Sequence, residues 1–348
     1  MSAELLTPAD RRWQEALDIV DHDVYHLPGY VTLEAVRLGG VPSAALVEAD
    51  DAMLLLPLVI REIPDSDGVV DAVSPYGYPG PVTTSGADPG RRALLAGRLV
   101  ELLRERNVCT AFIRGHPLLT PERALGAAVV EVEHGETVWL DLTLPEGEQV
   151  ELMSSTTRNL LRRTSRAGHV ARVAEEHAAL ERFHAIYVAT MDRLEAASEY
   201  FFTLEHLSGL RDALGDLARL VVVESDGEIT AGALFFVHGD IVQYHLSAAI
   251  RSGGPASPTR VAIDFARRLF ADEGRKVLHL GGGLGGEHDS LFEFKASFSP
   301  RRAAFRTLRI VADEARYEEL LRRSGIYPAD ASTSGFFPLY RSAAAGLR

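Results

Sequence analysis

A run of glycines constrains this chain more than any other stretch. Five of the six residues from Gly281 to Gly286 are glycine. A short apolar segment, residues 277–280, precedes the run, and Phe292, Phe294, Lys295 and Phe298 follow within two turns of a predicted helix that begins near 287. A short apolar segment bounded by turn residues is typical of a buried strand. The stretch therefore predicts a strand, a tight turn and a helix.

Lys295 stands out within that helix because of the composition of the whole chain. The sequence has 34 arginines but only two lysines, Lys276 and Lys295. An ammonium is a compact, rotatable donor and a guanidinium is a planar fork, so the two are not interchangeable at a reacting centre. Composition alone leaves two interpretations open, a functional ammonium and a solvated helix lysine.

Length, cysteine content and hydropathy limit the class of protein. A chain of 348 residues is long enough for two domains. The single Cys109 excludes an internal disulfide framework and a cysteine-based zinc cluster, and it fits a reducing cytoplasm. The polar N-terminus has no apolar signal segment, and the longest apolar run, residues 52–60, is much shorter than the roughly 20 residues of a membrane span. We expect a cytoplasmic protein with no membrane partner.

The charge of the chain is divided unevenly. Residues 1–150 hold 24 acidic and 11 basic residues, whereas residues 151–348 hold 25 of each. The acidic first half favours solubility, and a nucleic-acid partner would bind the second half. The breaker-rich segment 144–148, where the balance changes, predicts a domain boundary.

Each half of the chain has a similar order of predicted elements, with helices first, then strands, a helix and further strands. This order predicts an α/β fold with mixed sheets in two domains. We assign residues 1–145 to the first domain and 146–312 to the second. The C-terminal helix and tail, residues 313–348, are expected to pack on the first domain.

Two motifs of phosphate-binding loops occur, and neither fits its template completely. The glycine run matches G-x-G-x-x-G, but the window about 20 residues further on has no carboxylate to bind a ribose. Residues Arg251–Ala256 match R/Q-x-x-G-x-G/A, the coenzyme A pyrophosphate loop of GNAT acetyltransferases, although Pro255 and Pro258 remove two N–H donors. His279, His288 and Asp289 lack the spacing of a metal site, so no metal is expected.

Two other stretches carry candidate binding residues. Tyr76 and Tyr78 lie in a loop rich in proline and glycine, which predicts either a rigid turn or a binding wall. A helix predicted over 153–168 carries arginines at spacings of three and four, which suits phosphates but is also common on an exposed basic face. These arginines are Arg158, Arg162, Arg163 and Arg166.

The order of several motifs resembles the FemAB/FemX-like branch of the GNAT acyltransferase superfamily. The motifs are Tyr76–Pro81, Arg158–Arg163, Gly227–Leu234, Gln243–Ala248, Leu278–Gly283 and Phe292–Phe298. The resemblance is best over 150–312 and weaker over 1–145. It implies two tandem GNAT-like domains, the first on the acceptor side and the second on the acyl-donor side. Many members take an aminoacyl group from aminoacyl-tRNA, in place of an acyl group from coenzyme A, and transfer it to an amine.

The resemblance also implies roles for single residues. Lys295 matches the lysine that stabilises the oxyanion when the acceptor amine attacks the ester carbonyl, and Tyr244 matches a tyrosine on a strand of the site. The implied catalytic residues are Lys295 and Tyr244, and the implied substrate-binding residues are Tyr76, Tyr78, Arg193, His245 and Phe294. The four helix arginines named above are implied to bind tRNA phosphates.

The implied co-substrates are aminoacyl-tRNA and a small amine, with no cofactor and no DNA partner. The long helical hairpin of some peptidoglycan-bridge members is absent from the sequence, which favours a small soluble acceptor of the antibiotic or peptidoglycan-precursor type. Acyl-CoA is the alternative donor, and a non-catalytic binding protein is a third alternative.

The implied chemistry is simple because an aminoacyl ester is already activated. The enzyme must align amine and ester, stabilise the developing negative charge and let a proton leave. It therefore needs neither a covalent nucleophile nor a metal. Tyr244, His245 or a substrate phosphate could accept the proton, and the sequence does not choose among them.

Overall fold

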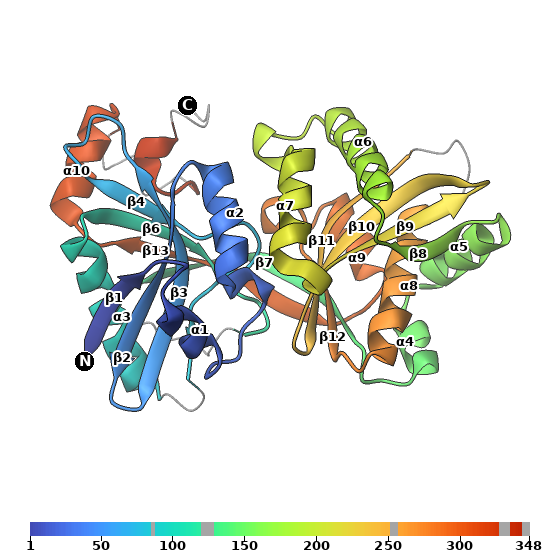
Figure 1. Cartoon of the computed structure of the whole chain (residues 1–348), viewed down its shortest axis with the longest axis horizontal. Coiled ribbons are helices and arrows are strands. Elements are labelled where there is room, and N and C mark those ends of the chain that lie inside the picture. The colour runs from blue at the N-terminus through green and yellow to red at the C-terminus, as the bar shows by residue number, and fades with distance from the viewer. Residues whose placement is uncertain (85–87, 120–128, 251–256, 327–334, 343–348) are drawn as a thin grey trace. The chain divides into compact units, whose positions relative to one another are not determined.

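The chain forms two compact units. The computed structural model describes residues 1–84, 88–119, 129–250, 257–326 and 335–342. Unit 1 comprises residues 1–133 and 305–348, and unit 2 comprises residues 134–304 (Figure 1). The chain passes from unit 1 to unit 2 within strand β7 (Val130–Asp141) and returns within β13 (Arg302–Val311). The boundaries expected at 145 and 312 both lie C-terminal to these crossings.

Unit 1 is built on a mixed sheet with the strand order β1-β2-β3-β4-β6-β13. β4 and β6 pair in parallel, and the other neighbours pair antiparallel. The strands are β1 (Ser2–Leu6), β2 (Val41–Ala49), β3 (Ala52–Glu62), β4 (Val70–Val73), β5 (Val82–Thr83, paired with β3), β6 (Val108–Arg114) and the end of β13. The helices are α1 (Arg11–Leu17), η1 (Val24–His26), α2 (Pro28–Leu38), α3 (Pro89–Glu105), α10 (Glu314–Arg323) and η5 (Leu339–Arg341).

Helices cover both faces of this sheet, which explains its long apolar strand. In β3, Leu54 and Leu56 pack in one core cluster with residues of α3. The alternate residues Met53 and Leu55 pack in a second cluster with Trp13 of α1 and with α2. Successive side chains of a strand point to opposite faces, so a strand buried on both faces is apolar throughout.

The strands of unit 2 lie in the order β7-β12-β11-β10-β9-β8, again with mixed pairing. β11 and β12 pair in parallel, and the other neighbours pair antiparallel. The strands are β8 (Val170–Ala174), β9 (Ala218–Ser225), β10 (Glu228–His238), β11 (Ile241–Ala249), β12 (Val277–Gly281) and most of β7. The helices are α4 (Glu146–Leu152), α5 (Ser155–Arg166), α6 (His177–Arg193), η2 (Ser198–Tyr200), α7 (Leu204–Leu214), η3 (Gly215–Leu217), α8 (Pro258–Asp272), η4 (Leu284–Gly286) and α9 (Ser290–Ala296).

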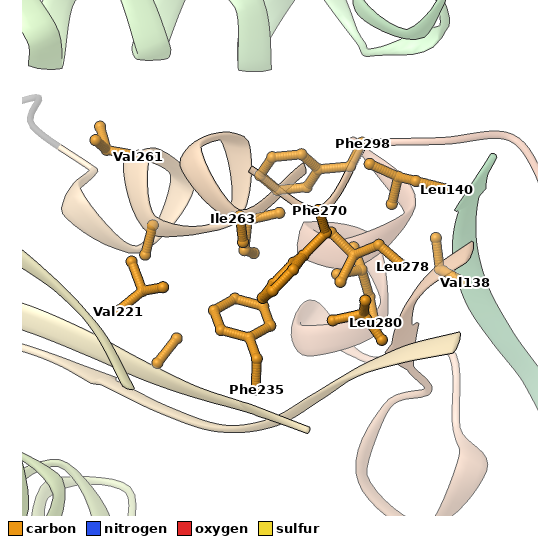
Figure 2. Packing of buried hydrophobic residues seen from close by; sticks show 14 of the residues in the cluster. Val138, Leu140, Val221, Phe235, Val261, Ile263, Phe270, Leu278, Leu280 and Phe298 are labelled. Atoms are coloured by element: carbon orange, nitrogen blue, oxygen red, sulfur yellow. The ribbon is translucent and has the colours of Figure 1, made fainter. Parts of the chain in front are cut away.

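Helix α8 packs on one face of the unit 2 sheet. Its Phe270 lies against Phe235 of β10, with ring centroids 5.7 Å apart, among the apolar side chains of β9, β12 and β7 (Figure 2). Phe298, just after α9, belongs to the same cluster. On the other face Phe183 of α6 lies so close to Gly232 that a Cβ there would come within 2.6 Å of its ring.

The predicted α/β class with mixed sheets is confirmed. Two local patterns are misleading, since Thr7-Pro8 is typical of a helix start and the proline and glycine of residues 27–30 are typical of a loop. Helix α1 begins at Arg11 with Asp10 as its N-cap, so Thr7-Pro8 precedes the helix. Pro28 and Gly29, predicted as a loop, open helix α2. Pro28 is tolerated there because the N–H groups of the first turn of a helix make no hydrogen bond within the helix.

The C-terminal segment adds a small core to unit 1. Leu320, Leu321, Leu339 and Tyr340 are buried in a cluster with Cys109 and residues of the segment 63–69. Among the described residues, no helix is long and apolar enough to cross a membrane.

Candidate active site

The glycine run forms a tight turn between β12 and α9. Gly281, Gly285 and Gly286 have φ angles of 76°, 63° and 90°, which residues with a Cβ rarely adopt. A Cβ on Gly283 would lie 2.0 Å from the carbonyl oxygen of Glu287. The predicted strand, turn and helix are thus all present, and the helix begins at Ser290.

Asp289 connects this turn to the helix that follows. It is the N-cap of α9, where one carboxylate oxygen accepts from the N–H of Phe292 (2.8 Å) and the other from the N–H of Leu284 (3.0 Å). Burial opposes ionisation, but these backbone hydrogen bonds outweigh it and lower the pKa of Asp289. The carboxylate therefore fixes where α9 starts relative to the turn.

Lys295 is buried, and its ammonium points back to the turn. The residue is 8% exposed, and its Nζ donates a hydrogen bond of 2.6 Å to the carbonyl oxygen of Gly282. Burial lowers the pKa of Lys295 to about 8, against the smaller opposing effect of Asp289. Lys276, by contrast, has a side chain 60% exposed and pairs with Asp240 at 2.8 Å. Of the two interpretations of Lys295, the solvated helix lysine is therefore excluded.

Strands β11 and β12 diverge beside this turn. Their parallel register runs from Ile241–Val277 to Gln243–His279. β12 then shifts its register on β7, pairing Gly281 with Val138, while β11 continues to Ala249. In the described part of the chain, the registered pairing of β11 with β12 ends at Gln243 and His279. The edge of a strand that leaves its neighbour can hydrogen-bond an extended ligand.

A β-bulge lies where the strands diverge. Phe235 of β10 pairs with Tyr244 and Leu234 pairs with Leu246, so His245 is the extra residue of β11. Bulges leave such a residue outside the ladder and are common beside active sites. The sequence placed Tyr244 and His245 on a strand, but it did not show this irregularity.

The side chains of Tyr244 and His245 have different environments. The Tyr244 hydroxyl donates to Ser247, the ring lies 5.6 Å from that of Phe235, and burial raises the pKa of Tyr244. Tyr244 and Phe294 both pack against the core cluster beneath α8. The His245 ring lies 4.2 Å from that of Phe236.

The pairing of two polar side chains in this region was not predicted from the sequence. Gln243 and His279, the last registered pair of β11 and β12, are both buried, and Oε1 of Gln243 lies 2.7 Å from Nδ1 of His279. His279 interrupts an otherwise apolar strand, whereas Gln243 lies in a strand that also carries His245 and Ser247, so nothing in the sequence indicates that the two residues pair. Arg260 of α8, whose guanidinium lies 4.6 Å from the centre of the Phe294 ring, was also missed.

The other predicted site residue of unit 2, Arg193, is the last residue of α6 and is exposed. A surface groove of about 710 Å³, lined by residues of β8, β9, α6 and α7, contains none of the predicted site residues.

The predicted tyrosine loop is held rigidly within unit 1. The N–H of Tyr76 donates to the buried carboxylate of Glu34 (3.0 Å), and its carbonyl accepts from the hydroxyl of Tyr30 (2.8 Å). The Tyr78 ring contacts Tyr25 edge-on at 6.0 Å. Both Tyr76 and Tyr78 are half-buried.

The loop rests on a buried polar layer that sequence analysis missed. Nε2 of His116 lies 2.9 Å from the carboxylate of Asp23, and Nε2 of His26 lies 2.9 Å from the carbonyl oxygen of Gly80. Burial, with His116 nearby, lowers the pKa of His26 to about 4. His26 is therefore neutral at physiological pH, and it supports the loop by hydrogen bonding without charge.

The four predicted tRNA-binding arginines differ in their availability. Arg158 of α5 donates to the carbonyl oxygens of Glu151 (3.1 Å) and Met153, where α4 ends, so its guanidinium is engaged within the protein. Arg162, Arg163 and Arg166 are exposed. The exposed part of this basic face is thus the end of α5 that follows Arg158.

The motifs weighed as cofactor or metal sites have other roles or lie outside the described residues. Arg251–Ala256, the possible pyrophosphate loop, lies outside them. His288 stacks on Phe292 at 4.0 Å, while His279 binds Gln243 and Asp289 caps α9. No group of three histidine, cysteine or carboxylate side chains in the described ranges could hold a metal ion.

Comparison with known proteins agrees with this architecture. Residues 153–295 match the acetyltransferase (GNAT) domain family. The fold is similar to that of FemX, with a TM-score of 0.71 and 12% identity over 92% of this chain and 99% of that one. The fold is also similar to that of L-PGS from Bacillus licheniformis, with a TM-score of 0.57 and 12% identity over 91% of this chain and 96% of that one. A third similar structure is the C-terminal domain of a putative lysylphosphatidylglycerol synthetase from Agrobacterium fabrum. Its TM-score is 0.55, with 17% identity over 87% of this chain and 92% of that one.

No curated protein matches the chain in sequence. The resemblance to the FemAB/FemX-like branch is confirmed at the level of the fold, as is the tandem GNAT-like architecture, and the GNAT family match over residues 153–295 supports the predicted acyltransferase class.

Proposed function

We propose that this chain, which has a FemX-like fold and a GNAT domain over residues 153–295, is an aminoacyltransferase that joins an amino acid from aminoacyl-tRNA to the amine of a small soluble acceptor. The observation that carries the proposal is the buried ammonium of Lys295, held at the turn between β12 and α9 beside the diverging end of β11. The product is an amide, and the deacylated tRNA leaves with the ester oxygen.

The proposed chemistry follows from the environment of Lys295. With a pKa of about 8 the side chain is mainly an ammonium at pH 7, and it is largely shielded from water. A cation fixed in a poorly hydrated site stabilises a developing oxyanion more strongly than one in water. The acceptor amine attacks the ester carbonyl, the oxyanion forms near Lys295, and the C–O bond to the tRNA ribose breaks. Tyr244, His245 or a substrate phosphate takes the proton from the amine.

The choice of donor rests on three supporting observations. The exposed arginines of α5 offer a basic surface in the half of the chain that is not acidic. Pro255 and Pro258 remove N–H donors from the loop that would hold a pyrophosphate. One protein with a similar fold is described as a putative lysylphosphatidylglycerol synthetase, a name that implies transfer of an aminoacyl group.

The direct test uses purified protein, a mixture of charged tRNAs and a panel of small amines. We expect an amide product whose formation stops after RNase treatment of the tRNA and which the Lys295→Ala variant forms at least 100-fold more slowly, the scale of one lost oxyanion donor. Circular dichroism would establish that the variant is folded. Transfer that persists after RNase treatment would overturn the choice of donor, and full activity of Lys295→Ala would remove Lys295 from the mechanism.

The second candidate is an acyl-CoA-dependent N-acyltransferase, which the GNAT family match favours. It predicts transfer from an acyl-CoA to the same amines without tRNA. It also predicts that Arg251→Ala, in the possible pyrophosphate loop, raises the KM for acyl-CoA. A protein that neither binds immobilised coenzyme A nor uses acyl-CoA would exclude this candidate.

A further inference from the structure

Helix α9 is too short to hold Lys295 in place without help. It spans seven residues, and helices of this length are unstable in isolation. Asp289 fixes its first turn. Lys295 lies in the last turn, so a second set of contacts must hold that end of the helix.

Arg260 of α8 supplies several of those contacts, beside the hydroxyl of Thr157 and the N–H of Ser154, which donate to the hydroxyl (2.8 Å) and the carbonyl oxygen (2.9 Å) of Ser297. Its guanidinium lies 4.6 Å from the ring centre of Phe294 and 5.5 Å from that of Phe298. Its Nη1 donates to the hydroxyl of Ser297 (2.8 Å) and to that of Thr157 on α5 (3.2 Å). The Arg260 side chain thus contacts Phe294, Ser297 and Phe298, which lie on both sides of Lys295 in the chain.

The charge of Arg260 has no acidic partner among the described residues, unlike that of Arg267 seven residues later. Arg267 is 1% exposed and pairs with Asp264 (2.9 Å) and Glu146 (3.3 Å). Arg260 is half-buried against aromatic rings and hydroxyls, and burial lowers its pKa. Its Nε is buried without a hydrogen-bond partner in this structure. An apolar side chain would avoid the cost of desolvation, so packing alone does not account for an arginine here.

The contacts of Arg260 are specific in direction. A guanidinium is favoured over an aromatic face, and its N–H groups bind hydroxyl oxygens in a fixed plane. Ring and hydroxyl contacts together define the rotation of α9 about its axis. That rotation determines where the ammonium of Lys295 lies relative to the carbonyl of Gly282.

We propose that Arg260 is a positioning residue, which holds the C-terminal turn of α9 so that the Lys295 ammonium stays at the glycine turn. The expected effect on catalysis rests on the proposed function, because it assumes that Lys295 is catalytic. The effect of Arg260 on the position of Lys295 does not depend on the proposed function. A displacement of about 1 Å at a reacting group costs about 100-fold in rate. Loss of Arg260 should therefore lower kcat by that order and leave the KM of both substrates nearly unchanged.

The test measures the environment of Lys295 directly. Lysine labelled with ¹³C at Cε gives two side-chain signals in this protein, and exposed Lys276 serves as the internal reference. In the Arg260→Met variant, we expect the pKa of Lys295 to move upward from about 8 towards its ordinary value, because a displaced ammonium regains water. The matched control is Arg268→Met, an exposed arginine of the same helix paired with Asp264, which should change neither signal.

A second variant separates positioning from charge, since removing any nearby cation also raises the pKa of a lysine. The double variant Ser297→Ala, Thr157→Val keeps the Arg260 charge and removes both hydroxyl acceptors, together with the hydrogen bond from Thr157 to Ser297 (2.8 Å). The single variant Thr157→Val also loses that bond but keeps the contact between Arg260 and Ser297, so it is the control for the double variant. Positioning predicts that the double variant raises the pKa of Lys295 and lowers kcat, with smaller effects than Arg260→Met. An unchanged Lys295 signal and kcat in the double variant would overturn the proposal, as would an unchanged signal in Arg260→Met.

The outcome is distinguishable from failure of the proposed function. If Lys295→Ala keeps full activity, the role of the ammonium in catalysis is wrong, yet the titration of Lys295 in the Arg260 variants still shows whether Arg260 holds α9.

Discussion

Lys295 carries a charge that lowers the stability of the folded protein at neutral pH. Its pKa is about 8 in the folded state, compared with an ordinary value of 10.5, because burial disfavours the ammonium. Between these two values the unfolded chain binds more protons than the folded one, so stability rises with pH across this window. Below pH 8 the ammonium is protonated in both states, and its burial costs about 3 kcal/mol, since one pKa unit corresponds to about 1.4 kcal/mol. The site thus keeps a charge that folding disfavours.

Replacing Lys295 by methionine should stabilise the protein and abolish rapid transfer. The hydrogen bond to Gly282 is lost, and an unpaired buried carbonyl costs about 1–3 kcal/mol, so we expect a net gain of about 1 kcal/mol in the free energy of unfolding at pH 7. Urea unfolding at pH 7 and at pH 10.5 checks this, because the gain should shrink at the higher pH. Lys276→Met is the control, and a Lys295→Met protein clearly less stable than the wild type at pH 7 would contradict the argument.

The same pKa predicts how activity depends on pH. If the ammonium stabilises the oxyanion, kcat should fall as pH rises through about 8, since Lys295 loses its proton there. A neutral lysine acting as a base would give a rise over the same range. The acceptor amine also titrates, so the profile should be repeated with an acceptor whose amine has a lower pKa. The limb due to the amine then shifts, whereas the limb due to Lys295 stays in place.

At the scale of elements, local signals were enough to predict the strand, turn and helix of residues 277–296, since glycine content and apolar spacing report local conformation. Features that depend on pairing between distant segments were not predictable. The bulge at His245 arises from the register of β10 on β11, and the Gln243–His279 pair arises from that of β11 on β12. Arg260 and Phe294 are likewise brought together by packing of two helices. Lys295 was recognisable because lysine is so rare in this chain and because Phe292–Phe298 resembles a motif of the family.

The turn should not tolerate a side chain at Gly283. A Cβ there would lie 2.0 Å from the carbonyl oxygen of Glu287 and 2.4 Å from the Asp289 carboxylate, so Gly283→Ala must displace the cap of α9. We expect a loss of about 1–3 kcal/mol in stability, the usual cost of local strain, and a fall in kcat. The control is Gly147→Ala in α4, where a Cβ meets nothing within 4 Å. Equal activity and unfolding midpoints for both variants would show that the turn adapts without cost.

On the scale of the whole molecule, a buried carboxylate fastens the C-terminal segment to unit 1. Asp71 of β4 is fully buried and accepts from Arg61 (3.0 Å), from the hydroxyl of Tyr340 (3.1 Å) and from Arg341. The Tyr340 hydroxyl also lies 2.7 Å from that of Thr110 on β6. The segment is thus held by hydrogen bonds within a buried layer as well as by apolar packing.

Tyr340→Phe tests this attachment. The substitution leaves Asp71 and Thr110 each without one hydrogen-bond partner, which should cost about 1–3 kcal/mol in unit 1. Hydrogen exchange should show faster exchange in β4 and β6, while β9 and β10 of unit 2 serve as the internal reference. If β4 and β6 exchange at the same rate in the variant and in the wild type, the Tyr340 hydroxyl contributes little to the stability of unit 1.

The crossings within β7 and β13 have a consequence for synthesis on the ribosome. β6 pairs with β13 through Thr110–Val311 and the neighbouring positions, so the unit 1 sheet stays open at β6 until residues 307–311 have emerged. All of unit 2, residues 134–304, is translated before them. The part of the protein that is made first is therefore the last to be completed, and until then it exposes a strand edge that is prone to aggregation.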